Sequence, residues 1–203
     1  MKLAPGKIAI VGVWLMAAAA GGWRLHQYES AAGGAAATPT QWPAESQIKM
    51  CHEHPTLVFF AHPKCPCTRA SVEELNRLMA RAQGRIETRA VFFQPSNYPI
   101  EWSRSSLWNS VVAIPGVSAQ ADSGGIEARR FGAETSGFVA LYGIHGRLLF
   151  RGGITASRGH AGNNPGADAI VALAKGDVVA THETPVFGCS LLDQCTASAK
   201  NQN

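Results

Sequence analysis

Residues 56–71 read TLVFFAHPKCPCTRAS, and this stretch decides the fold. It opens with a short run rich in β-branched and aromatic residues, which predicts a buried strand. From Thr68 onward apolar residues recur at steps of three and four, which predicts an amphipathic helix that ends at Gly84. Two cysteines, Cys65 and Cys67, therefore lie in a loop between a strand and a helix.

The pattern after this unit predicts further alternating elements. Residues 86–93, IETRAVFF, read as the next strand, so the opening unit is a βαβ crossover with parallel strands. Residues 138–144 and 147–151 alternate around His145-Gly146, which indicates a hairpin. We therefore expect an α/β fold, with a central mixed β-sheet flanked by helices. The remaining predicted elements are a helical insertion at 95–112, a short strand at 112–119, and helices at 123–131 and 167–174.

The N-terminal region has the layout of an export signal. The stretch from Ile8 to Trp23 carries no charge, and Lys2 and Lys7 precede it. A basic start before an apolar segment favours a membrane anchor or a cleaved signal, with the domain on the extracytoplasmic (periplasmic) side. The expected organisation is a signal-anchor or transmembrane segment at 1–29, a flexible linker at 30–41, one domain at 42–190 and a C-terminal tail at 191–203.

Composition narrows the class of protein. The chain has 203 residues, 46% hydrophobic and 16% charged, which is typical of a globular domain. Its formal net charge of +4 is scattered, without a basic run interleaved with aromatic residues, so we expect no nucleic-acid partner. Five cysteines are too few for a disulfide scaffold, and Cys51 and Cys195 are expected to be structural or idle.

The cysteine loop is suited to thiol chemistry. Proline is favoured at the first helical position, which would make Pro66 the start of the helix and Cys65 its N-cap. Unpaired backbone N–H groups and the helix dipole would then stabilise a thiolate at Cys65 or Cys67. A lowered pKa activates a cysteine, because the thiolate is the attacking species. Positive charge nearby is expected from Lys64, Arg69 and a protonated His62.

Several blocks of the chain resemble a known family. FFAHPKCPCTRAS, FGAETSG, LYGIHGRLLFRGGIT, SRGHAG and PVFGC are similar to the RedB-type membrane-anchored thioredoxin-like proteins of the thioredoxin superfamily. The resemblance implies a thioredoxin-like fold over residues 42–190. It also implies that Cys65 and Cys67 form the redox pair and that Pro66, Thr135 and Ser136 contact the substrate. Two features differ from that superfamily: one residue separates the cysteines instead of two, and residues 134–137 lack the usual proline.

The sequence thus indicates a thiol–disulfide oxidoreductase that acts on exported proteins without a cofactor. Cys65 would attack, and Cys67 would resolve the mixed disulfide, with Cys189 as the alternative resolving thiol. The resemblance implies thiol or disulfide groups of exported proteins as partners, such as an apocytochrome or a component of respiratory or copper-enzyme assembly. The chain has no Cys-x-x-Cys-His motif for c-type haem.

Three alternatives stay open at the level of sequence. His62, Cys65, Cys67 and His160 would suit Cu(I), with Cys189 as a further ligand, which favours a copper-binding or metallochaperone protein. A thiol peroxidase would need an arginine beside the thiolate, and Arg151 is the candidate. A non-catalytic interaction module would account for the altered cysteine spacing and the missing proline.

Overall fold

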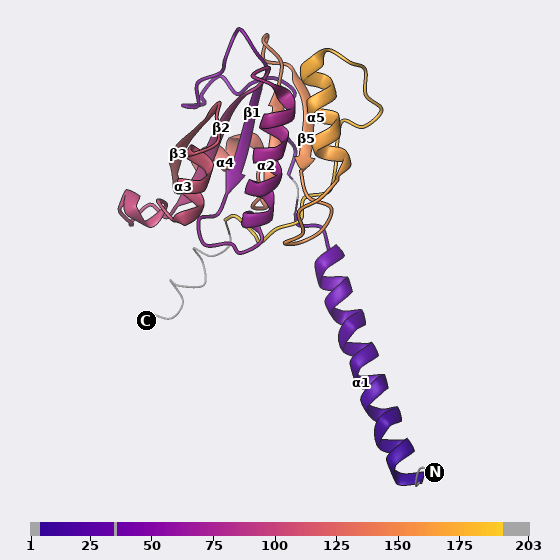
Figure 1. Ribbon diagram of the computed structural model, residues 1–203. Coiled ribbons are helices and arrows are strands. Elements are labelled where there is room, and N and C mark those ends of the chain that lie inside the picture. Colours follow the sequence, from indigo (N-terminus) through magenta and orange to yellow (C-terminus); the bar gives the residue numbers. More distant parts are fainter. Residues whose placement is uncertain (1–4, 35, 193–203) are drawn as a thin grey trace.

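The computed structural model describes residues 5–34 and 36–192 (Figure 1). Its strands form one five-stranded sheet in the order β3-β2-β1-β4-β5. Strand β1 is parallel to β2, which is parallel to β3, whereas β4 runs antiparallel to both β1 and β5. The strands are β1 Thr56–Ala61, β2 Glu87–Gln94, β3 Val117–Ser123, β4 Phe138–Tyr142 and β5 Leu148–Gly153.

Helices cover both faces of this mixed sheet, as expected for a thioredoxin-like fold. In Figure 1, α2 and α5 lie in front of the sheet and α4 lies behind it. The sequence therefore predicted the fold class and the parallel-then-antiparallel order of the strands correctly. The helices are α1 Pro5–Ser30, α2 Thr68–Ala82, α3 Ser106–Val112, α4 Ile126–Phe131 and α5 Pro165–Lys175, with a 3-10 turn, η1, at Ile100–Trp102.

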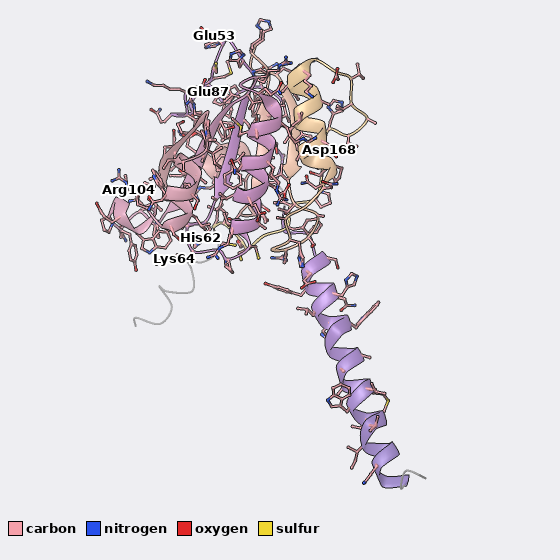
Figure 2. The ribbon with its side chains drawn as sticks, in the orientation of Figure 1. Glu53, His62, Lys64, Glu87, Arg104 and Asp168 are labelled. Carbon is pink, nitrogen blue, oxygen red and sulfur yellow. The ribbon has the colours of Figure 1, made fainter. Side chains whose placement is uncertain are left out.

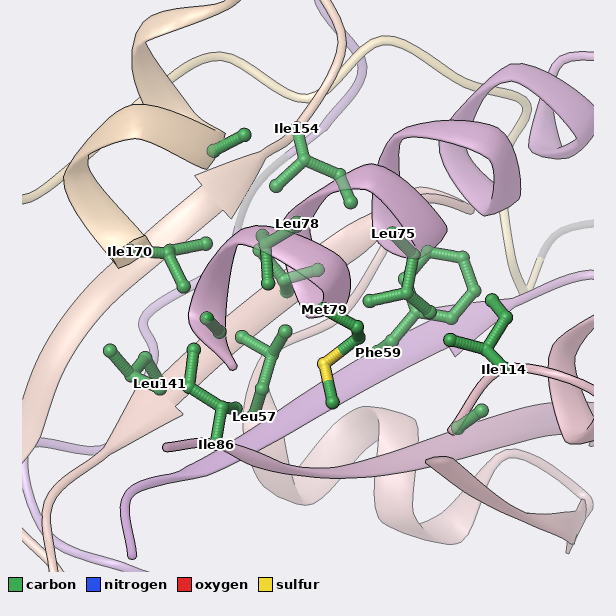
Figure 3. Close-up of a cluster of buried hydrophobic side chains, with 14 of the residues drawn as sticks. Leu57, Phe59, Leu75, Leu78, Met79, Ile86, Ile114, Leu141, Ile154 and Ile170 are labelled. Carbon is green, nitrogen blue, oxygen red and sulfur yellow. The ribbon is translucent and has the colours of Figure 1, made fainter. Parts of the chain in front are cut away.

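The apolar run in β1 is buried on both faces of the sheet. Leu57 and Phe59 point into the cluster under α2 and α5, which Figure 3 shows together with Leu75 of α2. Val58 and Phe60 point to the opposite side, into the cluster beneath α4. Because successive strand residues face opposite sides, a central strand covered on both sides needs a continuous apolar run. This packing fixes the end of β1, from which the cysteine loop emerges.

The strand expected at 112–119 is displaced in the structure. Strand β3 spans Val117–Ser123, because α3 continues to Val112 and a turn at Pro115-Gly116 separates the two elements. Gly116 has a φ of +79°, a conformation that suits glycine. The strand lies at the sheet edge, and its sequence, VSAQADS, lacks the apolar run of a central strand.

The stretch expected as a flexible linker at 30–41 lies against the domain at several points. The backbone N–H of Gly33 donates to the carbonyl of Val186, and Tyr142 Oη donates to the carbonyl of Pro39. The N–H of Leu148 donates to the carbonyl of Thr40. These contacts place the segment beside β4 and β5 rather than free of them.

The uncharged N-terminal stretch from Ile8 to Trp23 lies within α1, which projects away from the sheet in Figure 1. None of the helices in the described part of the chain has the length and apolar character needed to cross a membrane. The membrane span expected at 1–29 is therefore not found. Eight of the sixteen residues in that stretch are alanine or glycine, whose small side chains contribute little to transfer into hydrocarbon.

Candidate functional site

The cysteine loop occupies residues 62–67, at the carboxyl end of β1. Figure 2 shows His62 and Lys64 at this end of the sheet, with Glu53 and Glu87 at the other. The N–H of Cys65 donates to the carbonyl of His62 at 3.1 Å, and the N–H of Thr68 donates to the carbonyl of Cys65 at 3.2 Å. The chain thus makes two successive turns before the helix begins.

These turns correct the expected start of the helix. Helix α2 begins at Thr68 with Cys67 as its N-cap, so Cys65 is not the N-cap and Pro66 is not the first helical residue. Pro66 instead occupies the second position of the turn that Cys65 opens, where its fixed φ is favourable. Cys65 therefore lies just ahead of the helix, with its side chain only 3% exposed.

Three free thiols converge at this loop. The Sγ atoms of Cys65 and Cys189 lie 2.9 Å apart, although 124 positions separate the two residues in the chain. The Sγ atoms of Cys65, Cys67 and Cys189 all lie within 4.8 Å of one another. The sequence left open whether Cys67 or Cys189 is the partner of Cys65, and the structure places Cys189 in direct contact with it. Cys51 is free as well and lies at the other end of β1, next to Thr56.

Backbone pairing holds Cys189 in place. We call residues 185–192 the C-terminal strap. The N–H of Ser136 donates to the carbonyl of Cys189 at 2.9 Å, and the N–H of Leu191 donates to the carbonyl of Glu134 at 2.7 Å. Thr135 and Ser190 form an antiparallel bridge between these two bonds. The strap thus adds a short strand to residues 134–136, the segment in which the usual proline is missing.

The surroundings of the three thiols lower the pKa of one and raise the pKa of the other two. Burial raises the pKa of Cys65, but hydrogen bonds from the Cys189 thiol and from Thr68 outweigh it, and the pKa lies below the ordinary thiol value. Burial, followed by the contact with Cys65, raises the pKa of Cys189 to about 12. Burial and the charge of Cys65 raise the pKa of Cys67. Of the three thiols, Cys65 thus ionises most readily, and the Cys189 thiol donates a hydrogen bond that stabilises its ionised form.

His62 does not supply the positive charge expected of it. Its side chain is 2% exposed and stacks on Phe93. Burial and the nearby charge of Lys64 lower its pKa, so the ring is neutral near pH 7. Because Nδ1 accepts the N–H of Lys64, the proton is on Nε2, which has no partner among the described protein atoms. The ammonium of Lys64 lies 4.4 Å from the centre of the Trp102 ring.

A buried hydroxyl pair fixes the loop to the segment beneath it. Ser136 Oγ accepts the backbone N–H of His62 at 2.8 Å and lies 2.7 Å from Thr68 Oγ1. Both hydroxyl residues are 1% exposed. Thr135 Oγ1 donates to the carbonyl of Gly34. Of the residues expected to contact substrate, Ser136 and Thr135 thus lie beside the thiols, with their side chains bonded inside the chain.

Arg158 is the site residue that the sequence did not identify as such. Its guanidinium donates to the carbonyl of Gly188 in the strap and to the carbonyl of Ala31. Its positive charge also lowers the pKa of Cys67, opposing the effects of burial. The only signal in the sequence was its place in the block SRGHAG. Arg151, the arginine expected beside a peroxidatic thiolate, instead pairs with Glu183.

The metal alternative has a different ligand set from the expected one. Among the described residues, the metal-ligating side chains that lie together are Cys65, Cys67 and Cys189. His62 and His160 are not members of this group, and His160 Nδ1 is bonded to the carbonyl of Arg158. Three sulfur ligands could hold a soft ion such as Cu(I).

A pocket of about 150 Å³ has Cys65 among its lining residues. The loop residues on one side, including Lys64 and Pro66, face Ser106 and Leu107 at the start of α3. Arg69 of α2 completes its wall.

Comparison with known proteins shows similarity at the level of structure. Neither a protein-family model nor a curated protein matches the chain. A hypothetical protein from Sinorhizobium meliloti has 24% identity and a TM-score of 0.58, over 80% of this chain and 94% of that one. An uncharacterized conserved protein from Geobacillus kaustophilus has 18% identity and a TM-score of 0.56, over 80% and 92%. A secreted disulfide oxidoreductase of Mycobacterium tuberculosis, homologous to DsbE of E. coli, has 13% identity and a TM-score of 0.42, over 61% and 82%. The first two similarities show that the fold occurs in other bacterial proteins.

Proposed function

We propose that this chain is a thiol–disulfide oxidoreductase in which Cys65 attacks and Cys189 resolves. One observation carries the proposal: the two sulfur atoms lie 2.9 Å apart, and the pKa is lowered at Cys65 and raised at Cys189. An ionised sulfur is the nucleophile in thiol–disulfide exchange, and a hydrogen bond from a protonated neighbour stabilises it.

The reaction transfers two electrons to a disulfide of a partner protein. The Cys65 thiolate attacks one sulfur of that disulfide, so that the partner's S–S bond breaks and its other sulfur leaves as a thiolate. Cys189 then loses its proton and attacks the Cys65 sulfur, which releases the partner's second thiolate. The products are a Cys65–Cys189 disulfide and a partner dithiol, and the reverse sequence oxidises a partner.

Cys67 has a secondary role in this proposal. A Cys65–Cys67 disulfide would close a ring of three residues, which strains the bond. Cys189, in contrast, is contributed by a distant part of the chain and already lies 2.9 Å from the Cys65 sulfur. We therefore assign Cys189 rather than Cys67 as the resolving thiol.

Single substitutions test these roles. The reduced full-length chain is mixed with a disulfide-bonded protein, and exchange is followed by trapping the mixed disulfide. Cys65→Ala should abolish exchange, and Cys189→Ala should accumulate the mixed disulfide. Cys67→Ala should keep most of the rate, and Cys51→Ala, whose thiol lies at the far end of β1, is the matched control. Full exchange by Cys65→Ala would refute the proposal.

We further propose that the domain acts outside the cytoplasm, on exported proteins, as the RedB-type members to which its sequence is similar. The basic start followed by an uncharged segment supports export, and membrane attachment through residues 1–29 is part of the proposal. Cell fractionation of the full-length chain, with protease added to intact spheroplasts, tests both parts. Protease resistance in spheroplasts and digestion after lysis would place the domain inside and refute this assignment.

A further inference from the structure

The proposed reaction uses two of the three thiols at the loop and leaves a third one beside them. The Sγ atoms of Cys65, Cys67 and Cys189 all lie within 4.8 Å of one another, so Cys67 is close to both atoms of the proposed disulfide. A thiolate breaks a disulfide by attacking one of its sulfur atoms. Cys67 therefore has two possible targets, and the products of the two attacks differ.

The two attacks differ in the ring that forms and in the thiol that leaves. Attack on the Cys65 sulfur closes a strained ring of three residues and expels Cys189, whose pKa is raised to about 12. Attack on the Cys189 sulfur joins two distant parts of the chain and expels Cys65, whose pKa is lowered. Because a thiol of lower pKa leaves faster, the Cys189 sulfur is the favoured target.

Formation of the first disulfide also favours ionisation of Cys67. In the reduced site, burial is the largest cause of the raised pKa of Cys67, and the negative charge of Cys65 is the next. A sulfur in a disulfide carries no charge, so oxidation of Cys65 removes that second cause. The hydrogen bond from the Cys189 thiol, which lowers the pKa of Cys67, is lost as well, but its effect is smaller than that of the charge. The positive charge of Arg158, which also lowers this pKa, remains.

The sulfur of Cys189 can change partner while the backbone around it stays in place. The carbonyl of Cys189 accepts the N–H of Ser136, and Cys67 is fixed as the N-cap of α2. Rotation about the Cα–Cβ bond of Cys189 moves its Sγ between staggered positions. Cys65 is only 3% exposed, whereas Cys67 and Cys189 are partly exposed. A change of partner therefore moves the disulfide to the two more exposed sulfur atoms.

We propose that Cys67 is a relay thiol, which transfers the disulfide from Cys65–Cys189 to Cys67–Cys189. The inference rests on the proposed function and adds a third reacting group to it. Cys67 loses its proton to solvent and attacks the Cys189 sulfur, the Cys65–Cys189 bond breaks, and Cys65 leaves as a thiolate. One disulfide replaces another, so the step consumes neither an oxidant nor a reductant. Cys65 is thereby a free thiolate again, while the chain still carries its disulfide.

The test identifies which thiol is free in the oxidised chain. The full-length chain is used with Cys51→Ala and Cys195→Ala, so that the three cysteines of the site are its only thiols. It is oxidised with one equivalent of diamide, sampled over time, alkylated with iodoacetamide and mapped by mass spectrometry under acidic conditions. The Cys65–Cys189 link should appear first. The Cys67–Cys189 link should follow it, together with an alkyl label on Cys65.

Two controls accompany this measurement. In the same background, Cys67→Ser should keep the Cys65–Cys189 link and lose the label on Cys65. Transfer within one chain should give the same labelled fraction of Cys65 at several protein concentrations.

A label on Cys67 alone, with the link unchanged at Cys65–Cys189, would overturn the relay and leave the exchange chemistry standing. A labelled fraction of Cys65 that rises with protein concentration would overturn it too, because exchange between chains would then be the source. Failure of the proposed function looks different: the first link would leave out Cys189, or the Cys65→Ala variant would still exchange with a disulfide-bonded protein.

Discussion

Oxidation should stabilise the fold strongly, since the proposed disulfide joins distant parts of the chain. Cys65 and Cys189 are 124 positions apart. In the chain-entropy treatment, closing a loop of that length destabilises the unfolded state by about 5 kcal/mol, whereas a ring of three residues contributes about 2 kcal/mol before strain is subtracted. The sulfur atoms already touch in the reduced state, so forming the bond requires little movement.

Thermal unfolding measures this difference. For a domain of this size 1 kcal/mol corresponds to a shift in Tm of about 2–4 °C, so the oxidised chain should unfold about 10–20 °C above the reduced chain. Cys67→Ala should keep the shift, Cys189→Ala should lose it, and Cys51→Ala should behave as the unaltered chain. The assay is calorimetry on both redox forms, with mass mapping of the linked cysteines. A full shift in Cys189→Ala, or a shift of only about 3 °C or less in the unaltered chain, would refute the assignment of the pair.

Three further results are expected. Alkylation of Cys65 by iodoacetamide should reach half its maximal rate at a lower pH than alkylation of an ordinary thiol, because the pKa of Cys65 is lowered. Cys189→Ala removes a hydrogen-bond donor to the Cys65 thiolate and should shift this pH profile to higher pH. Identical pH profiles for the two proteins would contradict the prediction. Ser136→Ala leaves the buried N–H of His62 without its acceptor and should lower the free energy of unfolding, measured in urea titrations, by about 1–3 kcal/mol. The control, Ser110→Ala at an exposed site, should change it by less than about 0.5 kcal/mol. Equal effects of the two variants would count against a stabilising role for the Ser136–His62 hydrogen bond. A Cu(I) chelator should leave the exchange rate of the reduced chain unchanged, and loss of exchange on chelation would show instead that the three sulfurs work through a metal.

The sequence predicted the central part of the fold because the physical signals there are local. An apolar run long enough for one strand, followed by helical periodicity, identifies β1 and α2 without knowledge of the rest of the chain. The edge strand β3 has polar residues at every second position and follows a proline-glycine turn. The predicted strand, at 112–119, therefore begins several residues before the observed one, Val117–Ser123. Edge strands carry a weaker pattern because only part of their surface is buried.

The candidate site depends on contacts that no local pattern encodes. The loop cysteines were identified from their place between a strand and a helix, but the contact with Cys189 arises from pairing between segments that are far apart in the chain. The positive charge expected on His62 is not favoured, because burial of its ring lowers its pKa. That burial depends on Phe93 of β2 and Trp102 of η1, which are distant from His62 in the sequence. The block PVFGC contains Gly188, but the sequence does not show why a glycine is needed there. The reason is the closeness of the Ser136 carbonyl, which leaves no room for a Cβ at this position.

The hydrogen bond from Tyr142 to Pro39 also bears on how the domain should be cut for experiments. Tyr142 is fully buried, and its hydroxyl is bonded to a carbonyl that lies before Trp42, the first residue of the domain expected from sequence. A fragment beginning at Trp42 would strip away that acceptor and the carbonyl that receives the N–H of Leu148. A fragment that starts at Gly33 keeps the carbonyls of Pro39 and Thr40, and it also keeps the backbone hydrogen bond between Gly33 and Val186 of the C-terminal strap.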